Sequence, residues 1–270
     1  MNILVCISHV PDTTSKINFK DNNTAFDTNG IQFVINPYDE FGLTKALMLK
    51  EANGGTVTVL NVGPVATEPT IRKALAIGAD NAIRVNAEAT DSFYVASQIA
   101  NVVKQNNYDL IICGQESIDY NGGIVAGMVA ALCGMPFVNV CIGIDVDGSN
   151  ATILREIDGG KEELKATLPV VIGGKKGLVE ERDLRIPNMR GIMMARQKPL
   201  QVVEPVDSEM RTAAVSYEKP AAKAAKGVWI PTAAVAVVSV PVRCDSTGGG
   251  SGVARGYGAA TDTDTDRSIG

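Results

Sequence analysis

The chain has 270 residues, of which 45% are hydrophobic and 20% charged, and it carries a formal net charge of −5. This composition suits a protein that buries a large core, and the absence of a Lys/Arg cluster argues against nucleic-acid binding. The five cysteines include no CxxC pair and the chain has one His, so neither a zinc site nor a disulfide framework is predicted. No apolar run approaches about 18 residues and a strand begins directly after Met1, so we expect no membrane insertion, no signal peptide and a cytoplasmic location.

The first half of the chain alternates short apolar runs with helical patterns. The opening strand leads into a loop with Pro11 and Asp12, and turn residues at 21–23 predict a hairpin within 17–35. Asn36-Pro37 followed by two acids predicts the start of a helix with Asn36 as its N-cap. The predicted strands cover 2–8, 56–61, 81–85 and 109–113. The predicted helices run from Pro37 to the Gly54-Gly55 pair and over 67–77, 91–105 and 122–133.

This alternation predicts an α/β fold, a doubly wound and mostly parallel sheet with helices on both faces. Such sheets bind ligands beyond the carboxyl ends of their strands, where the strand order reverses. Loops 6–12, 62–66 and 114–123 meet this condition, and Asn36 lies on the same edge. Gly122-Gly123 opens a helix after a polar loop, and the first-turn N–H groups of a helix attract phosphate. The pattern fits nucleotide binding and also fits plain packing of small residues.

Beyond Pro136 the apolar period changes to two. Segments 137–146, 151–157 and 162–168 alternate and are separated by turns at 147–150 and 158–160. We therefore expect antiparallel hairpins that extend one edge of the sheet, followed by a buried strand at 169–173. Residues 188–198 combine three Met with several cations. They are either an ordinary helix start after Pro187 or an adaptable docking surface.

Composition divides the chain into three expected regions. Residues 1–205 form the nucleotide-binding α/β domain with its antiparallel extension. Residues 206–230 form a C-terminal arm or linker, which is rich in Ala and Lys at 219–227. Residues 231–270, with a Gly/Ser run and repeated Thr-Asp pairs, form an atypical flexible tail.

Residues 153–173 carry a longer and more specific pattern. It reads Ile153-x-Arg155-x-x-Asp158-Gly159-Gly160-x-Glu162-x-Leu164-x4-Pro169-x-Val171-Ile172. It resembles the signature of the electron transfer flavoprotein beta subunit, with Gly173 where that family has Thr, Ala or Cys. The resemblance extends over about residues 1–205 and implies a fold like that of the adenine nucleotide alpha hydrolases. It also includes Val10-Pro11-Asp12-Thr13, Asn36-Pro37, Val62-Gly63-Pro64, 74–80 and Ile186-Pro187-Asn188.

The resemblance implies an electron carrier subunit rather than an enzyme. The chain would pair with an alpha subunit that holds or shares the redox-active FAD. The heterodimer would carry electrons from acyl-CoA dehydrogenases or related flavoenzymes to a quinone oxidoreductase or another acceptor. The chain's own pocket would hold a structural AMP, or a second FAD in an electron-bifurcating complex. An adenylyl-transfer enzyme and an adenine-nucleotide-binding module without redox role are the competing hypotheses.

The resemblance also assigns binding residues, whereas no catalytic or metal-binding residue is assigned. The residues expected to line adenine and ribose are Cys6, Asn36 and Val62. Those expected to hold the phosphate are Asp119 and the backbone N–H groups of Gly122, Gly123, Ile124 and Val125. Those expected to dock onto a partner dehydrogenase are Ile186, in place of an anchoring Leu, with Pro187, Met189, Ile192 and Met193. The carboxylates Asp12, Glu116 and Asp119 match no metal motif, and a lone His9 is more often structural than catalytic.

Overall fold

The computed structural model describes residues 1–219, which form one compact unit. The predicted tail at 231–270 and the last part of the predicted linker lie outside the described residues.

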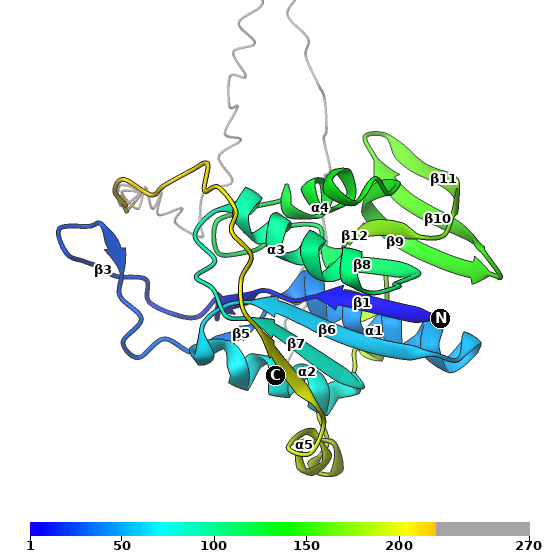
Figure 1. The fold of residues 1–270 in the computed structure, drawn as a ribbon, viewed down its shortest axis with the longest axis horizontal. Helices are drawn as coiled ribbons and strands as arrows, with labels where there is room; N and C mark the ends of the chain where they lie inside the picture. The colour runs from blue at the N-terminus through cyan, green and yellow to red at the C-terminus, as the bar shows by residue number, and fades with distance from the viewer. Residues whose placement is uncertain (220–270) are drawn as a thin grey trace, which may run out of the picture. The chain divides into compact units, whose positions relative to one another are not determined.

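The centre of the structure is a parallel sheet whose strands are buried on both faces. β1 (Asn2–Cys6) lies between β8 (Leu110–Gly114) and β6 (Thr56–Val62), and all three run in the same direction. Most of their side chains are apolar, as suits strands that helices cover on both sides, and Thr58 and Asn61 of β6 are buried polar exceptions. The other strands of this sheet are β7 (Asn81–Val85), β9 (Phe137–Asp147), β10 (Asn150–Ile157), β11 (Gly160–Thr167), β12 (Val170–Gly174) and β13 (Leu200–Val203). Within residues 1–219 the nine strands are ordered β11-β10-β9-β12-β8-β1-β6-β7-β13 (Figure 1).

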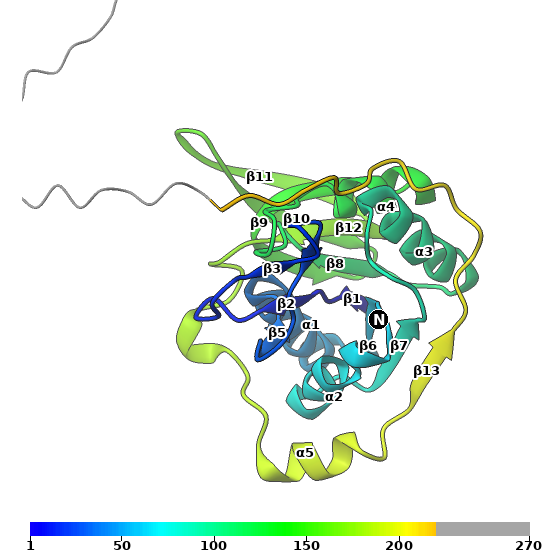
Figure 2. The same cartoon turned by 90° about the vertical axis from the view of Figure 1, so that its left-hand side faces the viewer.

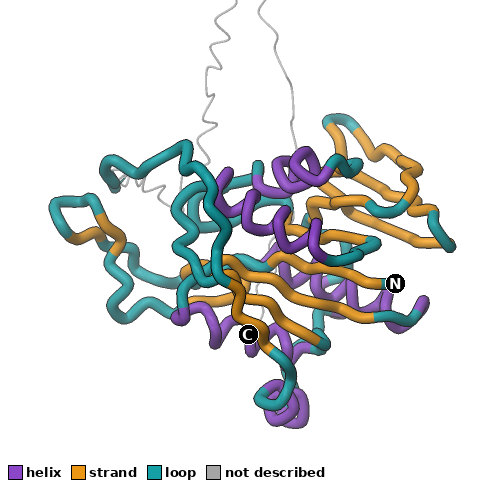
Figure 3. Tube along the Cα trace, in the orientation of Figure 1, coloured by secondary structure: helices purple, strands orange, loops and turns teal. Residues whose placement is uncertain are grey.

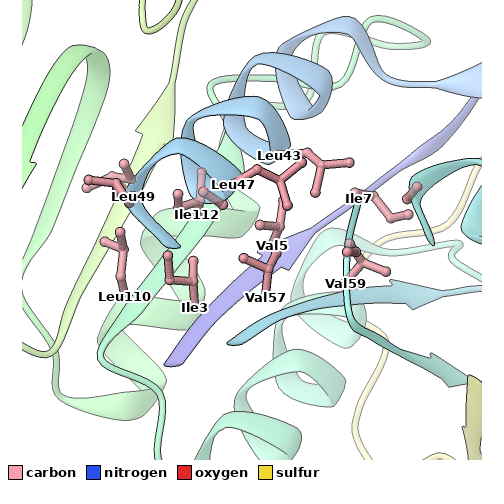
Figure 4. Close-up of a cluster of buried hydrophobic side chains, with 14 of the residues drawn as sticks. Ile3, Val5, Ile7, Leu43, Leu47, Leu49, Val57, Val59, Leu110 and Ile112 are labelled. Carbon is pink, nitrogen blue, oxygen red and sulfur yellow. The ribbon is translucent and has the colours of Figure 1, made fainter. Parts of the chain in front are cut away.

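Two pairs of helices enclose the sheet. α1 (Pro37–Asn53) and α2 (Glu68–Ile77) pack on one face, whereas α3 (Ser92–Gln105) and α4 (Val125–Cys133) pack on the other. Figure 4 shows how α1 meets the first face, with leucines directed at β1, β6 and β8. The labelled contacts are Leu43, Leu47 and Leu49 on Ile3, Val5, Val57, Val59, Leu110 and Ile112. The predicted doubly wound α/β fold is confirmed.

The antiparallel extension is also confirmed at one edge of the sheet. β9, β10 and β11 form two successive hairpins, and β9 joins the parallel part through β12. β9 carries an irregularity where Val140 adopts a φ of 57° and the pairing register shifts. A β-branched residue rarely adopts this conformation, so the bulge locally bends the strand.

Several predicted boundaries differ from the structure. β1 ends at Cys6 rather than Ser8, because the next residues form a separate strand, β2 (His9–Pro11), paired with β5 (Phe33–Ile35). The hairpin predicted over 17–35 is therefore limited to β3 (Phe19–Lys20) and β4 (Ala25–Phe26). A short 3₁₀ turn, η1 (Val65–Thr67), precedes α2. α4 begins at Val125 rather than Gly122, because a bridge between Ser117 and Gly122 keeps the preceding residues in the loop.

The Met-rich segment forms a short helix, α5 (Met189–Ala195), which the Asn188 side chain caps by accepting a hydrogen bond from Gly191 N at 2.7 Å. Two cations connect α5 and α2, and we call their contacts the clamp. One belongs to α2 and the other follows α5, and each donates to carbonyl groups at or just beyond the C-terminal end of the other helix. Arg72 of α2 donates to the carbonyls of Ala195 at 2.8 Å and of Lys198 at 2.9 Å. Lys198 in turn donates to the carbonyls of Leu75 at 2.9 Å and Ala79 at 2.6 Å. Cations are stabilising at helix C-termini, so this clamp fixes the segment that follows.

The clamp leads directly into β13, a strand that the sequence patterns did not predict. β13 adds to the sheet beside β7, and its four residues have no clear alternation of burial. Residues 206–219 then lie along the α/β body. Gln98 exchanges two hydrogen bonds of 2.8 Å with the backbone of Val206, and the Arg211 guanidinium lies 3.7 Å from the centre of the Phe93 ring.

Arg72→Met should lower the free energy of unfolding by about 1–3 kcal/mol, because it leaves two carbonyls at the end of α5 without their charged donor. Urea denaturation of the purified chain measures this change. Arg182→Met is the matched control, since Arg182 is an exposed arginine with no ion pair within residues 1–219. Equal stability of the two variants would contradict the clamp.

Candidate functional site

The strand order reverses beside β1. The chain passes from β1 to β6 and β7 on one side and later returns to β8 on the other, so the crevice that such a reversal creates in α/β sheets is expected at the carboxyl ends of β1 and β8. Nucleotides bind at such switch points in α/β sheets. The loops that follow these strands gather at this end (Figures 2 and 3). Cys6 and Val62 end their strands here, and the loop with Asp119 follows β8.

Asn36 reaches across this edge to the loop after β8. Its side-chain nitrogen donates to the carbonyl of Glu116 at 2.8 Å, and its oxygen accepts a hydrogen bond from the N–H of Ile118 at 3.3 Å. The predicted N-cap position of Asn36 is confirmed, but its side chain makes no capping hydrogen bond. The amide is committed to shaping the loop, because a buried amide must satisfy both of its polar ends.

A buried carboxylate, Asp39, joins the two strands of the crevice. Its two oxygens accept hydrogen bonds from Ser8 N, just beyond β1, at 2.7 Å and from Gly114 N, at the end of β8, at 2.8 Å. Only 2% of Asp39 is exposed. Burial raises its pKa from 3.8 to about 7, although the hydrogen bonds from Ser8, Asn36 and Gly114 oppose this shift.

The sequence alone identifies Asp39 only as an acid in the first turn of a helix. A signal for burial was nevertheless present, because Asp39 precedes Leu43 by one helical turn and lies on the same stripe as the apolar residues of α1. Gly114 is matched to it: a Cβ at this position would come within 2.3 Å of an Asp39 oxygen. The buried position of the Asp39 carboxylate therefore requires a glycine at position 114.

The loop after β8 places the open end of α4 at the same edge. Asp119 accepts hydrogen bonds from the Ser117 hydroxyl and, at 2.9 Å, from Tyr120 N. Asn121 turns the chain with a φ of 56°, and Ser117 N donates to Gly122 O at 3.0 Å. The carboxylate of Asp119 thus orders the turn that presents the backbone. Its contact with a phosphate stays a prediction.

Gly122, Gly123 and Ile124 lead into α4, whose first residue is Val125. The first-turn N–H groups of a helix have no intrahelical acceptors and carry partial positive charge. Ile124 is more than half exposed, so solvent reaches this helix end. The predicted phosphate residues are therefore adjacent in space, and the group can bind an anion through backbone donors.

Two buried cysteines end neighbouring strands at this edge, on the side of the sheet that α3 and α4 cover. Cys6 and Cys113 end the neighbouring strands β1 and β8 and belong to one apolar cluster with Val62. A hydrogen bond with Cys113, together with burial, holds the pKa of the Cys6 thiol well above its usual range. A neutral thiol is a poor nucleophile, so Cys6 offers an apolar side chain rather than covalent chemistry.

The contacts of His9 are those of a structural residue. Its Nδ1 lies 2.7 Å from the Thr70 hydroxyl, and its ring stacks on Phe33 with centroids 4.3 Å apart. Burial lowers the pKa of His9, which keeps the imidazole neutral. The histidine joins β2, β5 and α2, as expected for a structural residue.

Gly173, where the sequence departs from the family pattern, has a structural partner. A Cβ at this position would lie 2.1 Å from the side-chain oxygen of Asn139, on the neighbouring strand β9. That oxygen is buried and has no hydrogen-bond partner within residues 1–219. Asn139 therefore occupies the space that a larger residue at 173 would need.

The predicted docking residues lie apart from the edge of the sheet where the strand order reverses. Figures 1 and 2 show α5 on the outside of α2, away from the loop that follows β8. Ile186 is 84% exposed and Met189 76% exposed, and both belong to a surface that we call the α5 patch. The exposed members of the α5 patch are Ile186, Met189, Ile192, Met193 and Met194. Pro187, the remaining docking candidate, is half-buried between them and α2.

Within residues 1–219 the structure contains neither a group of metal ligands nor a helix that could cross a membrane. No three His, Cys, Asp or Glu side chains in this part of the chain are grouped as metal ligands. Among its helices, none combines the length and the hydropathy that a membrane crossing requires.

Comparison with known proteins identifies relatives over most of the chain. Residues 23–208 match the model of the electron transfer flavoprotein domain. The chain is similar to the electron transfer flavoprotein subunit beta of Bacillus subtilis, with 34% identity covering 78% of this chain and 81% of the relative. The subunit beta of Syntrophomonas wolfei is 35% identical, covering 83% and 88%. The human subunit beta is 31% identical, covering 86% and 93%.

The raised pKa of Asp39 predicts a specific dependence of stability on pH. Between about pH 4 and 7 the folded chain binds more protons at this site than the unfolded chain, so the free energy of unfolding falls as pH rises. Asp39→Asn removes this contribution. The stability of the variant relative to the unsubstituted chain should therefore increase by up to about 1.4 kcal/mol per pH unit between pH 5 and 7.

Urea denaturation at several pH values measures this difference directly. Other titrating groups, His9 among them, affect both proteins equally and cancel in the comparison. Parallel pH curves would show that Asp39 stays ionised throughout, with its hydrogen bonds outweighing the effect of burial.

Proposed function

The chain belongs to the electron transfer flavoprotein beta-subunit family, and we propose that it pairs with an alpha subunit to carry electrons between flavoenzymes. The donors would be acyl-CoA dehydrogenases or related flavoenzymes, and the acceptor a quinone oxidoreductase or another redox partner. In this role the chain performs no bond chemistry of its own. It positions the FAD that the alpha subunit holds or shares, and it presents a surface to the donor.

The observation that carries the nucleotide-binding part of this proposal is the network around Asp39 and Asn36. Asp39 joins the ends of β1 and β8, and Asn36 holds residues 116–118 beside them. Together they fix a crevice between two strands at the strand-order reversal, with the start of α4 at its rim. A structural adenine nucleotide needs such a site: an apolar wall for the base and a helix start for the phosphate.

Each part of an adenine nucleotide has a candidate position in this crevice. Cys6 and Val62 offer the apolar wall for adenine, and Asn36 lies between that wall and the loop after β8. The backbone from Gly122 to Val125 offers the donors for phosphate. Asp119 would keep that backbone in place rather than contact the phosphate through a donor, because an ionised carboxylate has no hydrogen to donate.

AMP is the occupant that we propose for this site. A bound nucleotide would stabilise the folded chain, by ~2.7 kcal/mol at a hundredfold excess over Kd. FAD presents the same adenine and phosphate groups to the same loops, so a bifurcating complex with a second FAD is the second candidate. Adenylyl transfer is less well supported, because the raised pKa keeps the Cys6 thiol neutral and His9 is engaged with Thr70.

We also propose that the α5 patch docks onto the donor. The patch is apolar and exposed, and the clamp between α2 and α5 holds it in a fixed orientation. Methionine side chains adapt to differently shaped partners, which suits a carrier that must meet more than one protein. A preformed surface also lowers the entropy cost of association.

Ligand analysis tests the proposed assembly. The chain is co-expressed with its alpha subunit, the complex is purified, and acid-released FAD and AMP are quantified by chromatography. We expect one FAD and one AMP per heterodimer. Two FAD without AMP would identify the bifurcating type. A heterodimer with neither ligand, or the absence of any heterodimer, would overturn the carrier proposal.

Ile186→Glu should slow reduction of the heterodimer by an acyl-CoA dehydrogenase at least tenfold, because it places a charge where an apolar contact is expected. The FAD and AMP content should not change, since Ile186 lies far from the crevice. Stopped-flow absorbance of the flavin measures the rate. Ile157→Glu is the control, because Ile157 is also an exposed isoleucine, at 43% against 84% for Ile186, and lies on β10 outside the α5 patch. Equal rates for both variants would contradict docking through Ile186.

A further inference from the structure

A groove runs along the seam where α5 packs on α2. Its volume is about 520 Å³, within the range of roughly 300–1,000 Å³ that is typical of ligand pockets. The groove is lined from α2 by Pro69, Arg72, Lys73 and Ala76, and from the α5 side by Pro187, Ile192, Ala195 and Arg196. Its walls are therefore formed by two elements that are distant in sequence and fixed against each other.

All charged residues that line the groove are basic. Its lining includes Arg72, Lys73 and Arg196 but no acid. Lys73 is paired with Glu40 at 2.7 Å, and Arg72 uses one guanidinium nitrogen for the carbonyls of the clamp. Arg196 is exposed and has no ion pair within residues 1–219. A bound segment would thus meet positive charge that the fold leaves only partly compensated.

The remaining lining is apolar and continues onto the protein surface. Ala195 is buried and Ala76 half-buried, whereas Pro69 is exposed and Ile192 has 43% of its surface exposed. Met189 and Met193 extend the apolar area along the outer face of α5. A free small anion would use the cations but not this surface. An amphipathic helix uses both, because its apolar stripe fills a groove while its polar side chains meet the rim.

We propose that the groove between α2 and α5 receives an acidic amphipathic helix of the partner flavoprotein, which inserts an aliphatic side chain between Ile192 and Ala76. The assignment rests on the docking role proposed for the α5 patch and adds a receptor site beside it. The partner's carboxylates face Arg196 and Arg72 at the rim, and opposite charges speed association and fix its orientation. The α5 patch and the groove are then two halves of one interface, one inserted into the partner and the other filled by it.

The probe for this interface is a fluorescein-labelled helical peptide with a leucine stripe flanked by glutamates. Its counterpart carries lysine in place of every glutamate. Fluorescence anisotropy is recorded against the purified heterodimer at low ionic strength. We expect the acidic peptide to bind at least tenfold more tightly than the basic one. Equal affinity for both peptides, or no binding of the acidic one, would overturn the proposal.

Two pairs of variants locate the binding site. Arg196→Glu should weaken acidic-peptide binding at least tenfold, whereas Lys161→Glu, the same charge change on the distant strand β11, should not. Ile192→Ala should weaken binding severalfold, whereas Met194→Ala should not, because Met194 is a comparably exposed residue of α5 that does not line the groove. Equal effects within either pair would overturn the assignment. Self-association of the heterodimer that Arg196→Glu abolishes would likewise overturn it, by assigning the groove to a second copy.

Electron transfer from the dehydrogenase separates this inference from the proposed function. Slower transfer in Arg196→Glu and Ile192→Ala, with normal FAD and AMP content, is the result expected if the donor uses the groove. Unchanged transfer in variants that no longer bind the peptide would overturn the groove as a donor site and leave the carrier role intact. A heterodimer that accepts no electrons even without substitutions would overturn the carrier role, whatever the peptide shows.

Discussion

The crevice of this protein depends on one buried carboxylate. Asp39 accepts hydrogen bonds from the N–H groups that follow β1 and end β8, so the ends of the two strands are held together at one carboxylate. Its burial is unfavourable for the charge and raises its pKa to about 7. The surrounding fold must therefore compensate, which it does with the hydrogen bonds of Ser8, Gly114 and Asn36. A strained or costly group of this kind persists where geometry matters more than stability.

The fold class and the position of the crevice could be predicted from the sequence. Short apolar runs such as 109–113 and the glycine-flanked helices predicted a parallel sheet, and strand order then placed the loops with Cys6, Val62 and Asp119 at one edge. These features are local or follow from general topology. β13 was missed because its four residues carry no alternation, and the reciprocal clamp that precedes it joins residues far apart in the chain.

The side-chain roles were harder to predict than the elements. Asn36 had the sequence context of an N-cap, yet its amide bonds a loop eighty positions away. Asp39 had the context of a surface acid in the first turn of a helix, yet both of its oxygens face strand ends. In both cases tertiary contacts override a correct local pattern, since the same residue types serve caps and long-range links.

The reciprocal clamp holds α2 and α5 together as one rigid unit. Arg72 and Lys198 fasten each helix to the end of the other, so a push on α5 is borne by α2 as well. α2 starts shortly after Val62, at the loop that closes one side of the crevice. A partner that docks on the α5 patch, as proposed, would therefore also press on the helix that begins beside this loop.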